Sequence, residues 1–154
     1  NACQDDLVYD HYFKPAVATA AKWGLTKALS IAILYDATIV HGNEGNGEIV
    51  LHANQVTNNH ERKPGEAPLS QDAESAWLEA FLLYRLDLLH DEAKDRGALY
   101  EQLRRDGNWD LAATIVTNAK AHAMFPDKGY QDSHYPSCTI DPAGAVSGEP
   151  ACTQ

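Results

Sequence analysis

The chain has 154 residues, an ordinary hydrophobic content and a formal net charge of −10. This length predicts one domain, residues 1–154, with enough apolar residues to bury a core. The acidic charge argues against nucleic acid as a partner, because neutralising phosphates requires a basic face. It is compatible with a cationic substrate or with solubility alone. Residues 31–40, the most apolar segment, are too few to cross a bilayer, so no membrane partner is expected.

The first predicted element is a long, nearly all-apolar helix over residues 15–42. Pro15 suits a first helical turn and Gly42 a helix end. Helices that are apolar all round lie at the centre of a domain. Asn-Gly turns follow, and the apolar run after them predicts a short strand over residues 48–53.

A second long helix is predicted to begin after Ser70, which is a good N-cap. Asp72 and Glu74 lie in its first turn, where negative charge is favourable. Shorter helices are predicted over residues 97–105 and 110–123, with residues 126–154 an irregular tail. The expected fold class is therefore mainly α (α+β), with a small β element after the first long helix.

The three cysteines lie near the ends of the chain, at Cys3, Cys138 and Cys152. They form no close pair and the histidines are scattered, so we expect neither a metal site nor another cofactor. A bridge between Cys138 and Cys152, which flank the Pro- and Gly-rich tail, is the first choice, and Cys3 bonded to either is the second. Such a loop stabilises by roughly 3 kcal/mol. Disulfides persist in oxidising compartments, which predicts a secreted, extracellular protein.

One carboxylate, Asp36, lies within the apolar helix, and Glu44 and Glu48 follow its expected end. Charges beside an apolar centre are costly unless something pairs with them or uses them. Glu44 would lie just past a helix C-terminus, where the dipole disfavours a negative charge, so it is expected to hold its proton near neutral pH. Asp10 is a third candidate, because the lead-in can return over the same cleft.

The segment YDHYFKPAVATAAKWGLTKALSIAILYDATIVHGNEG resembles the C-terminal half of the family 46 chitosanases. The match continues at AWLEAFLLYRLDLL and, more loosely, at DRGALYEQLRRDGNWDL, and it covers about residues 5–115. Its most specific pieces are residues 35–37, residues 41–42 and Arg85. The resemblance implies a lysozyme-like fold. It also implies a buried charge relay to the catalytic acid, formed here by Asp36, Arg85 and Arg96.

In that family the catalytic glutamate and aspartate lie in an N-terminal lobe outside the matched segment. If the chain is complete, the relay must serve a catalytic carboxylate that lies within this chain. A second resemblance, in domain size, secretion and lysozyme-like character, is to the fungal muramidase catalytic domains of glycoside hydrolase family 184. It implies bacterial peptidoglycan as the substrate and leaves room for an appended cell-wall-binding domain.

Glycoside hydrolysis needs a protonated acid and a second carboxylate roughly 5–10 Å away. Glu44 is the predicted general acid, Glu48 or Asp10 its partner, and Asp36 with Arg85 the supporting pair. Six further residues suit sugar hydroxyl and acetamido groups: Tyr9, Tyr35, Asn43, Asn46, His52 and Asn54. Trp23, Trp77 and Trp109 are expected in the core rather than as sugar platforms.

The sequence thus predicts a secreted, monomeric glycoside hydrolase that cleaves β-1,4 bonds in peptidoglycan. Chitosan is the alternative substrate, because the acidic charge favours a polycation while the missing lobe favours a different polymer. A third hypothesis is a non-catalytic module that binds a cell-wall glycan or serves as a secreted effector. On that view Glu44 and Glu48 are solvated turn residues.

Overall fold

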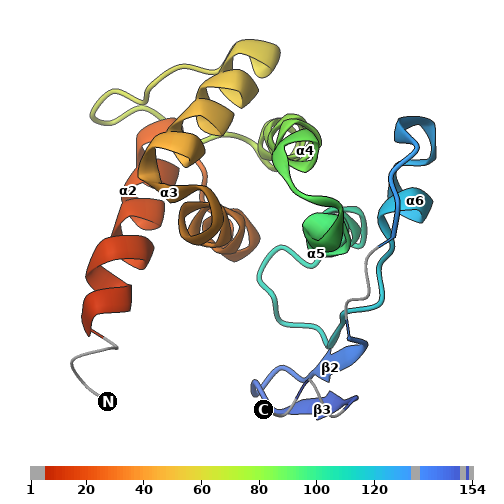
Figure 1. The fold of residues 1–154 in the computed structure, drawn as a ribbon. Coiled ribbons are helices and arrows are strands. Elements are labelled where there is room, and N and C mark those ends of the chain that lie inside the picture. Colours follow the sequence, from red (N-terminus) through yellow and green to blue (C-terminus); the bar gives the residue numbers. More distant parts are fainter. Residues whose placement is uncertain (1–5, 133–135, 150–151, 153–154) are drawn as a thin grey trace. The chain divides into compact units, whose positions relative to one another are not determined.

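The computed structural model describes residues 6–132, 136–149 and 152. In chain order its elements are η1 (Tyr9–Phe13), α2 (Lys14–Trp23), α3 (Ala28–Thr57), α4 (Gln71–Leu88), α5 (Asp91–Arg105), β1 (Ile115–Val116), α6 (Ala121–Met124), η2 (Pro126–Lys128), β2 (Cys138–Ile140) and β3 (Val146–Gly148) (Figure 1). The mainly helical class with a small sheet is confirmed. Within the described residues, no helix has the length and apolar character needed to span a membrane. The chain divides into two compact units, Asn1–Phe81 and Leu82–Gln154, with the boundary in the sequence of α4, and each unit is described separately.

The helix predicted over residues 15–42 begins as expected, with Pro15 in the first turn of α2, but it is interrupted after Trp23 and does not end at Gly42. Gly24 ends α2 in a left-handed conformation (φ 78°), and its N–H bonds to the carbonyls of Ala20 and Ala21. The next helix, α3, begins at Ala28 and runs past Gly42 to Thr57. At Gly42 the backbone has φ 71° and ψ 175°, so the glycine kinks α3 instead of ending it.

The strand predicted over residues 48–53 is also wrong, because these residues are helical. Ile49, Val50 and Ala53 are buried, at the spacing of one helical face rather than of alternating strand positions. Glycine and asparagine are weak helix formers, but burial of this apolar face outweighs their low propensity.

The second long helix, α4, begins as predicted: the Ser70 hydroxyl accepts the Ala73 N–H at 3.3 Å. Glu74 has a role that its first-turn position did not predict. Its buried carboxylate accepts the N–H groups of Thr26 and Lys27, both at 3.0 Å, and the Ser30 hydroxyl. These groups belong to the start of α3, so α4 supplies the cap that α3 lacks in its own sequence.

In the second unit, α5 starts earlier than predicted, at Asp91, and the helix expected over residues 110–123 is not formed. Leu111 has a left-handed φ of 55°, and the Asn108 side chain accepts the Ala113 N–H at 3.2 Å, which holds the segment as a loop. Only the short helix α6 remains of the prediction. Buried Asp95 accepts the Ala121 N–H at its start at 2.8 Å.

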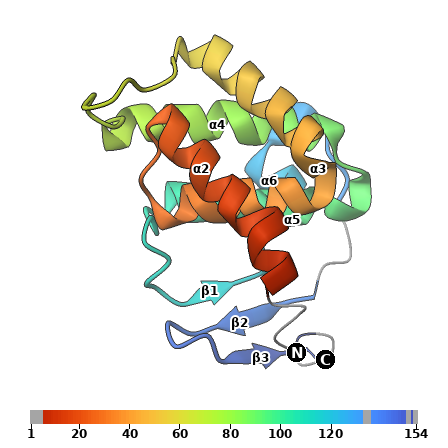
Figure 2. The ribbon, with the colours of Figure 1, turned by 90° about the vertical axis from the view of Figure 1, so that its left-hand side faces the viewer.

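The small sheet lies in the second unit, and not after the first long helix as predicted. Its three antiparallel strands are ordered β1-β2-β3 (Figure 2). Ile115 lies opposite Ile140, and Thr139 lies opposite Ser147. The tail expected to be irregular therefore contributes both β2 and β3.

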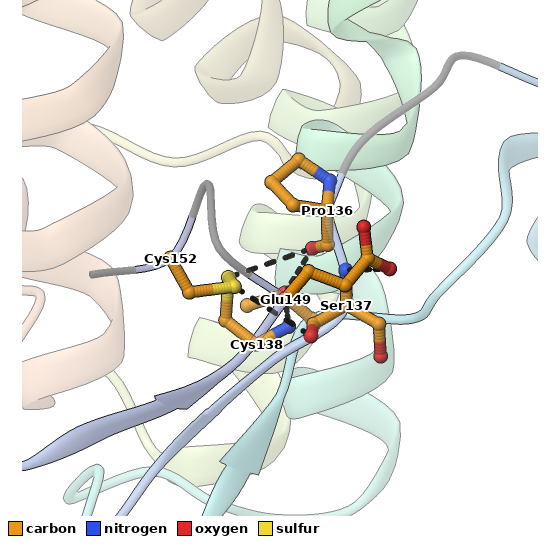
Figure 3. Close-up of a disulfide and its surroundings, with 6 residues drawn as sticks. Pro136, Ser137, Cys138, Glu149 and Cys152 are labelled. Carbon is orange, nitrogen blue, oxygen red and sulfur yellow. Dashed lines mark hydrogen bonds between the residues drawn. A yellow bond between two sulfur atoms is a disulfide. The ribbon is translucent and has the colours of Figure 1, made fainter. Parts of the chain in front are cut away.

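A disulfide joins Cys138 and Cys152, the pairing predicted first, with Cα atoms 5.6 Å apart. It lies where the Ser137 N–H donates to the Glu149 carboxylate at 3.1 Å (Figure 3). Cys3, the second choice of partner, lies outside the described residues.

Candidate functional site

A pocket of about 620 Å³ lies in the first unit, between α2 and the part of α3 that follows Gly42. Its volume falls in the range of small-molecule sites. The residues of α2 that line it are Pro15, Thr19, Lys22 and Trp23, and those of α3 include Asn43, Glu44, Asn46, Glu48, Val50 and Leu51. The structure thus brings four of the predicted site residues, at positions 43, 44, 46 and 48, to one cavity.

Glu44 and Glu48 are exposed and stand on successive turns of α3. Residues four apart on a helix have Cβ atoms about 5–6 Å apart, so the two carboxylates are neighbours, as predicted, although on a helix and not on a folded loop. Two like charges at this spacing destabilise a helix by about 0.2–0.5 kcal/mol.

Glu44 does not lie at the helix end that the sequence predicted, on which its role as general acid was based. Glu44 follows the Gly42 kink and so lies in the first turn of a helical segment, not beyond a helix C-terminus. A helix start favours a negative charge. The structure therefore gives no support to the dipole argument for a protonated Glu44, and its catalytic role stays a sequence-based prediction.

Asn46 forms part of the pocket wall and is only 5% exposed. Thr38 fixes its amide: the Thr38 hydroxyl donates to the Leu34 carbonyl at 2.8 Å and accepts from Asn46 Nδ2 at 2.9 Å. The other amide atom, Asn46 Oδ1, has no hydrogen-bond partner within the described residues. A buried acceptor without a donor is costly.

Trp23 is half-buried and lines the pocket, so the expectation that it is a core residue is wrong. Asn59 donates to its backbone carbonyl at 3.1 Å, which anchors the end of α2. The Lys22 ammonium lies 5.4 Å from the Trp23 ring centroid and pairs with Glu61 at 3.3 Å. The aromatic face is therefore already in contact with one ammonium group.

The sequence interpretation missed the α2 side of this pocket. Pro15, Thr19, Lys22 and Trp23 recur at i, i+4, i+7 and i+8, the spacing of one helical face. That spacing was visible in the sequence, but it does not reveal that α3 lies opposite.

Asp10, Tyr9 and Tyr35 do not line the pocket. Asp10 forms an exposed ion pair with Lys14 on the next turn. Tyr9 stacks on Phe13 with ring centroids 5.4 Å apart, and Tyr35 meets Phe13 edge-on at 6.1 Å. These side chains form an aromatic group at the start of the first unit, and a sugar-binding role for them stays a prediction.

His52 and Asn54 lie further along α3 and also stand outside the pocket lining. Asn54 is buried, and its Oδ1 accepts Trp77 Nε1 at 2.7 Å and Asn59 Nδ2 at 3.1 Å. These bonds make Asn54 part of the core around Trp77, which is itself fully buried as expected.

The side chains of the predicted charge relay are largely buried. Asp36 is 3% exposed, Arg85 is 1% exposed and Arg96 is half-buried. Burial of this kind requires compensating partners, since an isolated charge would be very costly. Asp36 belongs to the first unit and both arginines to the second, so the relay stays a prediction.

A second pocket, of about 630 Å³, lies in the second unit between the C-terminal part of α5 and the segment that follows it. Trp109, Asp106 and Asp110 contribute to its walls, so Trp109 is also not a core residue. None of the sequence-predicted site residues lies there.

Comparison with known proteins gives a consistent result. The family model for glycosyl hydrolase family 46 matches residues 1–115. A chitosanase of Bacillus subtilis (strain 168) is 30% identical over 132 residues, covering 78% of this chain and 47% of the relative. The solved structure of a family 46 chitosanase of Gynuella sunshinyii, in complex with chitotetraose, superposes with a TM-score of 0.63 at 30% identity, covering 73% of this chain and 50% of that one.

The chain therefore spans about half the length of the relatives that it matches. The structural match supports the lysozyme-like fold expected from the sequence. The family match covers α2, α3 and α4, the elements that carry the pocket and most of the buried charges. On these grounds the chain belongs to glycosyl hydrolase family 46.

Proposed function

We propose that the protein acts in the hydrolysis of β-1,4 bonds in chitosan, a polymer of cationic amino sugars. The observation that carries this proposal is the acidic pocket of the first unit, where Glu44 and Glu48 lie beside Trp23. Carboxylates suit the ammonium groups of such a polymer, and an aromatic ring suits the apolar face of a sugar.

The relatives support the same substrate. The Bacillus subtilis and Gynuella sunshinyii proteins are both chitosanases, and the latter was solved with chitotetraose. The net charge of −10 also favours a polycation. Peptidoglycan, the first choice from the sequence, was preferred because the matched segment does not include the catalytic lobe of the chitosanases. Because the chain spans only half of its relatives, that reason carries little weight.

We further propose an extracellular location. The Cys138–Cys152 disulfide supports it, because such bonds persist in oxidising compartments. Chitosan and cell-wall glycans are also polymers that an enzyme meets outside the cell.

Two parallel assays test the substrate. In the first, the protein is incubated with chitosan and the release of reducing ends is measured; in the second, clearing of a bacterial cell suspension is followed. Heat-denatured protein serves as the blank. We expect reducing ends from chitosan and no clearing of the cells.

The opposite pattern, clearing without release from chitosan, would contradict the proposal and return peptidoglycan to first place. Activity in neither assay would contradict hydrolysis and favour a glycan-binding module.

A further inference from the structure

We propose that residues 58–69, the segment between α3 and α4, form a strap that fixes the end of α2, and that Arg62 in this strap is a positioning residue for Trp23. The strap belongs to the first unit, as the pocket between α2 and α3 does. The inference deepens the proposed function and rests on it, since it adds a residue that acts on the pocket from outside the lining.

The strap supplies hydrogen bonds to two successive carbonyls at the end of α2. The Arg62 N–H donates to the Lys22 carbonyl at 2.8 Å, and the Asn59 side chain donates to the Trp23 carbonyl at 3.1 Å. The last carbonyls of a helix have no partner within that helix. The strap therefore satisfies groups that would otherwise leave the last turn of α2 loosely held.

Gly24 makes room for the strap at the turn that follows α2. A Cβ added to Gly24 would lie 2.7 Å from Arg62 Nε and 3.1 Å from Arg62 Cδ, so the Arg62 side chain lies directly over the glycine. The Gly24 carbonyl accepts the Leu69 N–H at 2.9 Å. The strap is thus fixed to the end of α2 both near its start and at its last residue.

The Arg62 guanidinium orients the amide that holds Trp23. Arg62 Nη2 donates to Asn59 Oδ1, which leaves the Asn59 nitrogen to donate to the Trp23 carbonyl and, at 3.1 Å, to Asn54 Oδ1. Asn54 Oδ1 also accepts Trp77 Nε1, so the same amide is connected to the buried core. Arg62 therefore acts on Trp23 through Asn59.

Glu66 fixes Arg62 from the other side. Its Oε1 accepts Arg62 Nη1 at 2.9 Å and lies 2.7 Å from His60 Nε2, while its Oε2 accepts the Lys63 N–H at 2.9 Å. The Lys63 N–H and the His60 contact hold the pKa of Glu66 below its usual range. The Arg62 side chain is only 16% exposed, so this charge-assisted contact is less screened than a pair in open solvent.

The strap acts on the pocket through the last turn of α2. Lys22 and Trp23 line the pocket, and theirs are the two carbonyls that the strap holds. No residue of the strap belongs to the lining. Releasing the strap should leave the composition of the pocket unchanged but let Trp23 move. The cost of ordering Trp23 would then oppose ligand binding.

The first part of the test reports on Trp23 in the protein without ligand. Acrylamide quenching of tryptophan fluorescence is measured in a Trp109→Phe background. Of the two tryptophans that remain, Trp77 is fully buried and Trp23 is half-buried, so quenching reports chiefly on Trp23.

Three variants are compared in this background: Arg62→Ala, Asn59→Ala and the double variant. Lys63→Ala removes a neighbouring exposed cation of the strap and is the matched control. The second part of the test measures KM and kcat for chitosan in the same variants. Circular dichroism and thermal unfolding verify that each variant folds. If Arg62→Ala does not fold, Asn59→Ala, which removes a smaller side chain, carries the same expectation.

Arg62→Ala should raise the quenching constant about twofold. It should also raise KM about three- to tenfold, the range expected for the loss of one hydrogen bond, with kcat within about twofold of the parent. Asn59→Ala should have the same effects, and the double variant should add little to them, because the two side chains act in series. Lys63→Ala should match the parent in both measurements.

An unchanged quenching constant in Arg62→Ala and Asn59→Ala would overturn the inference. Fully additive effects in the double variant would overturn it too, since Arg62 would then not act through Asn59. If no reducing ends are released from chitosan by the parent protein, the proposed function fails. The quenching constants, which need no substrate, then decide the role of the strap on their own.

Discussion

At the scale of single residues, Glu74 shows how one buried carboxylate can organise two helices. It accepts the N–H groups of Thr26 and Lys27 and the hydroxyl of Ser30, at a helix start whose own N-cap side chain makes no hydrogen bond. Unpaired N–H groups at a helix start are costly when buried, so this carboxylate stabilises both the start of α3 and its packing on α4.

Glu74→Gln should therefore destabilise the protein by about 2–3 kcal/mol. The glutamine amide keeps one acceptor oxygen, but its NH2 group would face N–H and O–H donors with which it cannot form hydrogen bonds. Chemical denaturation gives the free energy of unfolding. Glu79→Gln, on the exposed side of the same helix, is the control and should change it by less than about 0.5 kcal/mol. Equal values for the two variants would show that the cap contributes nothing.

A second residue-scale contact makes stability depend on pH. In the second unit, Asp87 accepts the Tyr130 hydroxyl and pairs with Lys128 at 3.3 Å. The Tyr130 hydrogen bond, with a smaller contribution from Lys128, holds the pKa of Asp87 below its usual range. Burial of the phenol and the bond to Asp87 raise the pKa of Tyr130 in turn.

A carboxyl whose pKa is lower in the folded state stabilises the fold above its unfolded pKa, about 3.9, and this stabilisation is lost as the pH falls through the folded pKa. Tyr130→Phe should shift the pKa of Asp87 toward its usual value, visible by NMR titration. It should also reduce the loss of stability below about pH 4. The side chain of Asp87 is 51% exposed, so the difference should stay under about 1 kcal/mol. An unchanged pKa of Asp87 in the variant would contradict this assignment.

At the scale of elements, the kink in α3 determines where the pocket lies. Gly42 has φ 71° and ψ 175°, a conformation that is essentially restricted to glycine. The helix resumes directly after it and carries the acidic wall of the pocket. Without the kink the residues after position 42 would continue along the original axis.

Gly42→Ala should destabilise the protein by about 1–3 kcal/mol through backbone strain alone, since an added Cβ would meet no atom within 4 Å. Gly47 lies within the resumed helix, and an added Cβ there also meets open space. Gly47→Ala should therefore stabilise by about 0.5–1 kcal/mol. The two variants give opposite signs in thermal unfolding if the conformations are as described; destabilisation by both would refute the helical assignment of Gly47.

The features that were predicted correctly depend on residues close to them in the sequence. The start of α4 follows from Ser70, and the Cys138–Cys152 bridge follows from its place around a turn-rich tail. The continuation of α3 through Gly42 and Gly47 was not predictable in this way, because burial of Ile49 and Val50 overrides local turn preference. The helix expected over residues 110–123 failed for a similar reason, since Asn108 and Leu111 fix a loop there.

The candidate site was predictable only in part. Glu44 and Glu48 are four residues apart, so they lie close together whether the segment forms a folded loop or a helix. Their environment does not, since the dipole acting on Glu44 reverses once α3 continues past Gly42. The contribution of Trp23 depends on α2 facing α3 across the pocket, which is a tertiary contact that no local pattern encodes.

At the scale of the whole molecule, family membership, the formal net charge of −10 and the two carboxylates in the pocket lining support the proposal of a cationic polysaccharide. The chain spans about half the length of its relatives, so hydrolysis belongs to the proposal for the whole protein. Binding and proton transfer leave different kinetic signatures. A residue that only binds substrate changes KM, whereas an acid changes kcat.

The most direct measurement is therefore the steady-state kinetics of chitosan hydrolysis by Glu44→Gln/Glu48→Gln, beside the wild type and Glu79→Gln. We expect KM to rise about tenfold with kcat within about twofold of the wild type. A fall in kcat of a hundredfold or more at unchanged KM would contradict a binding role and identify one of these carboxylates as the acid.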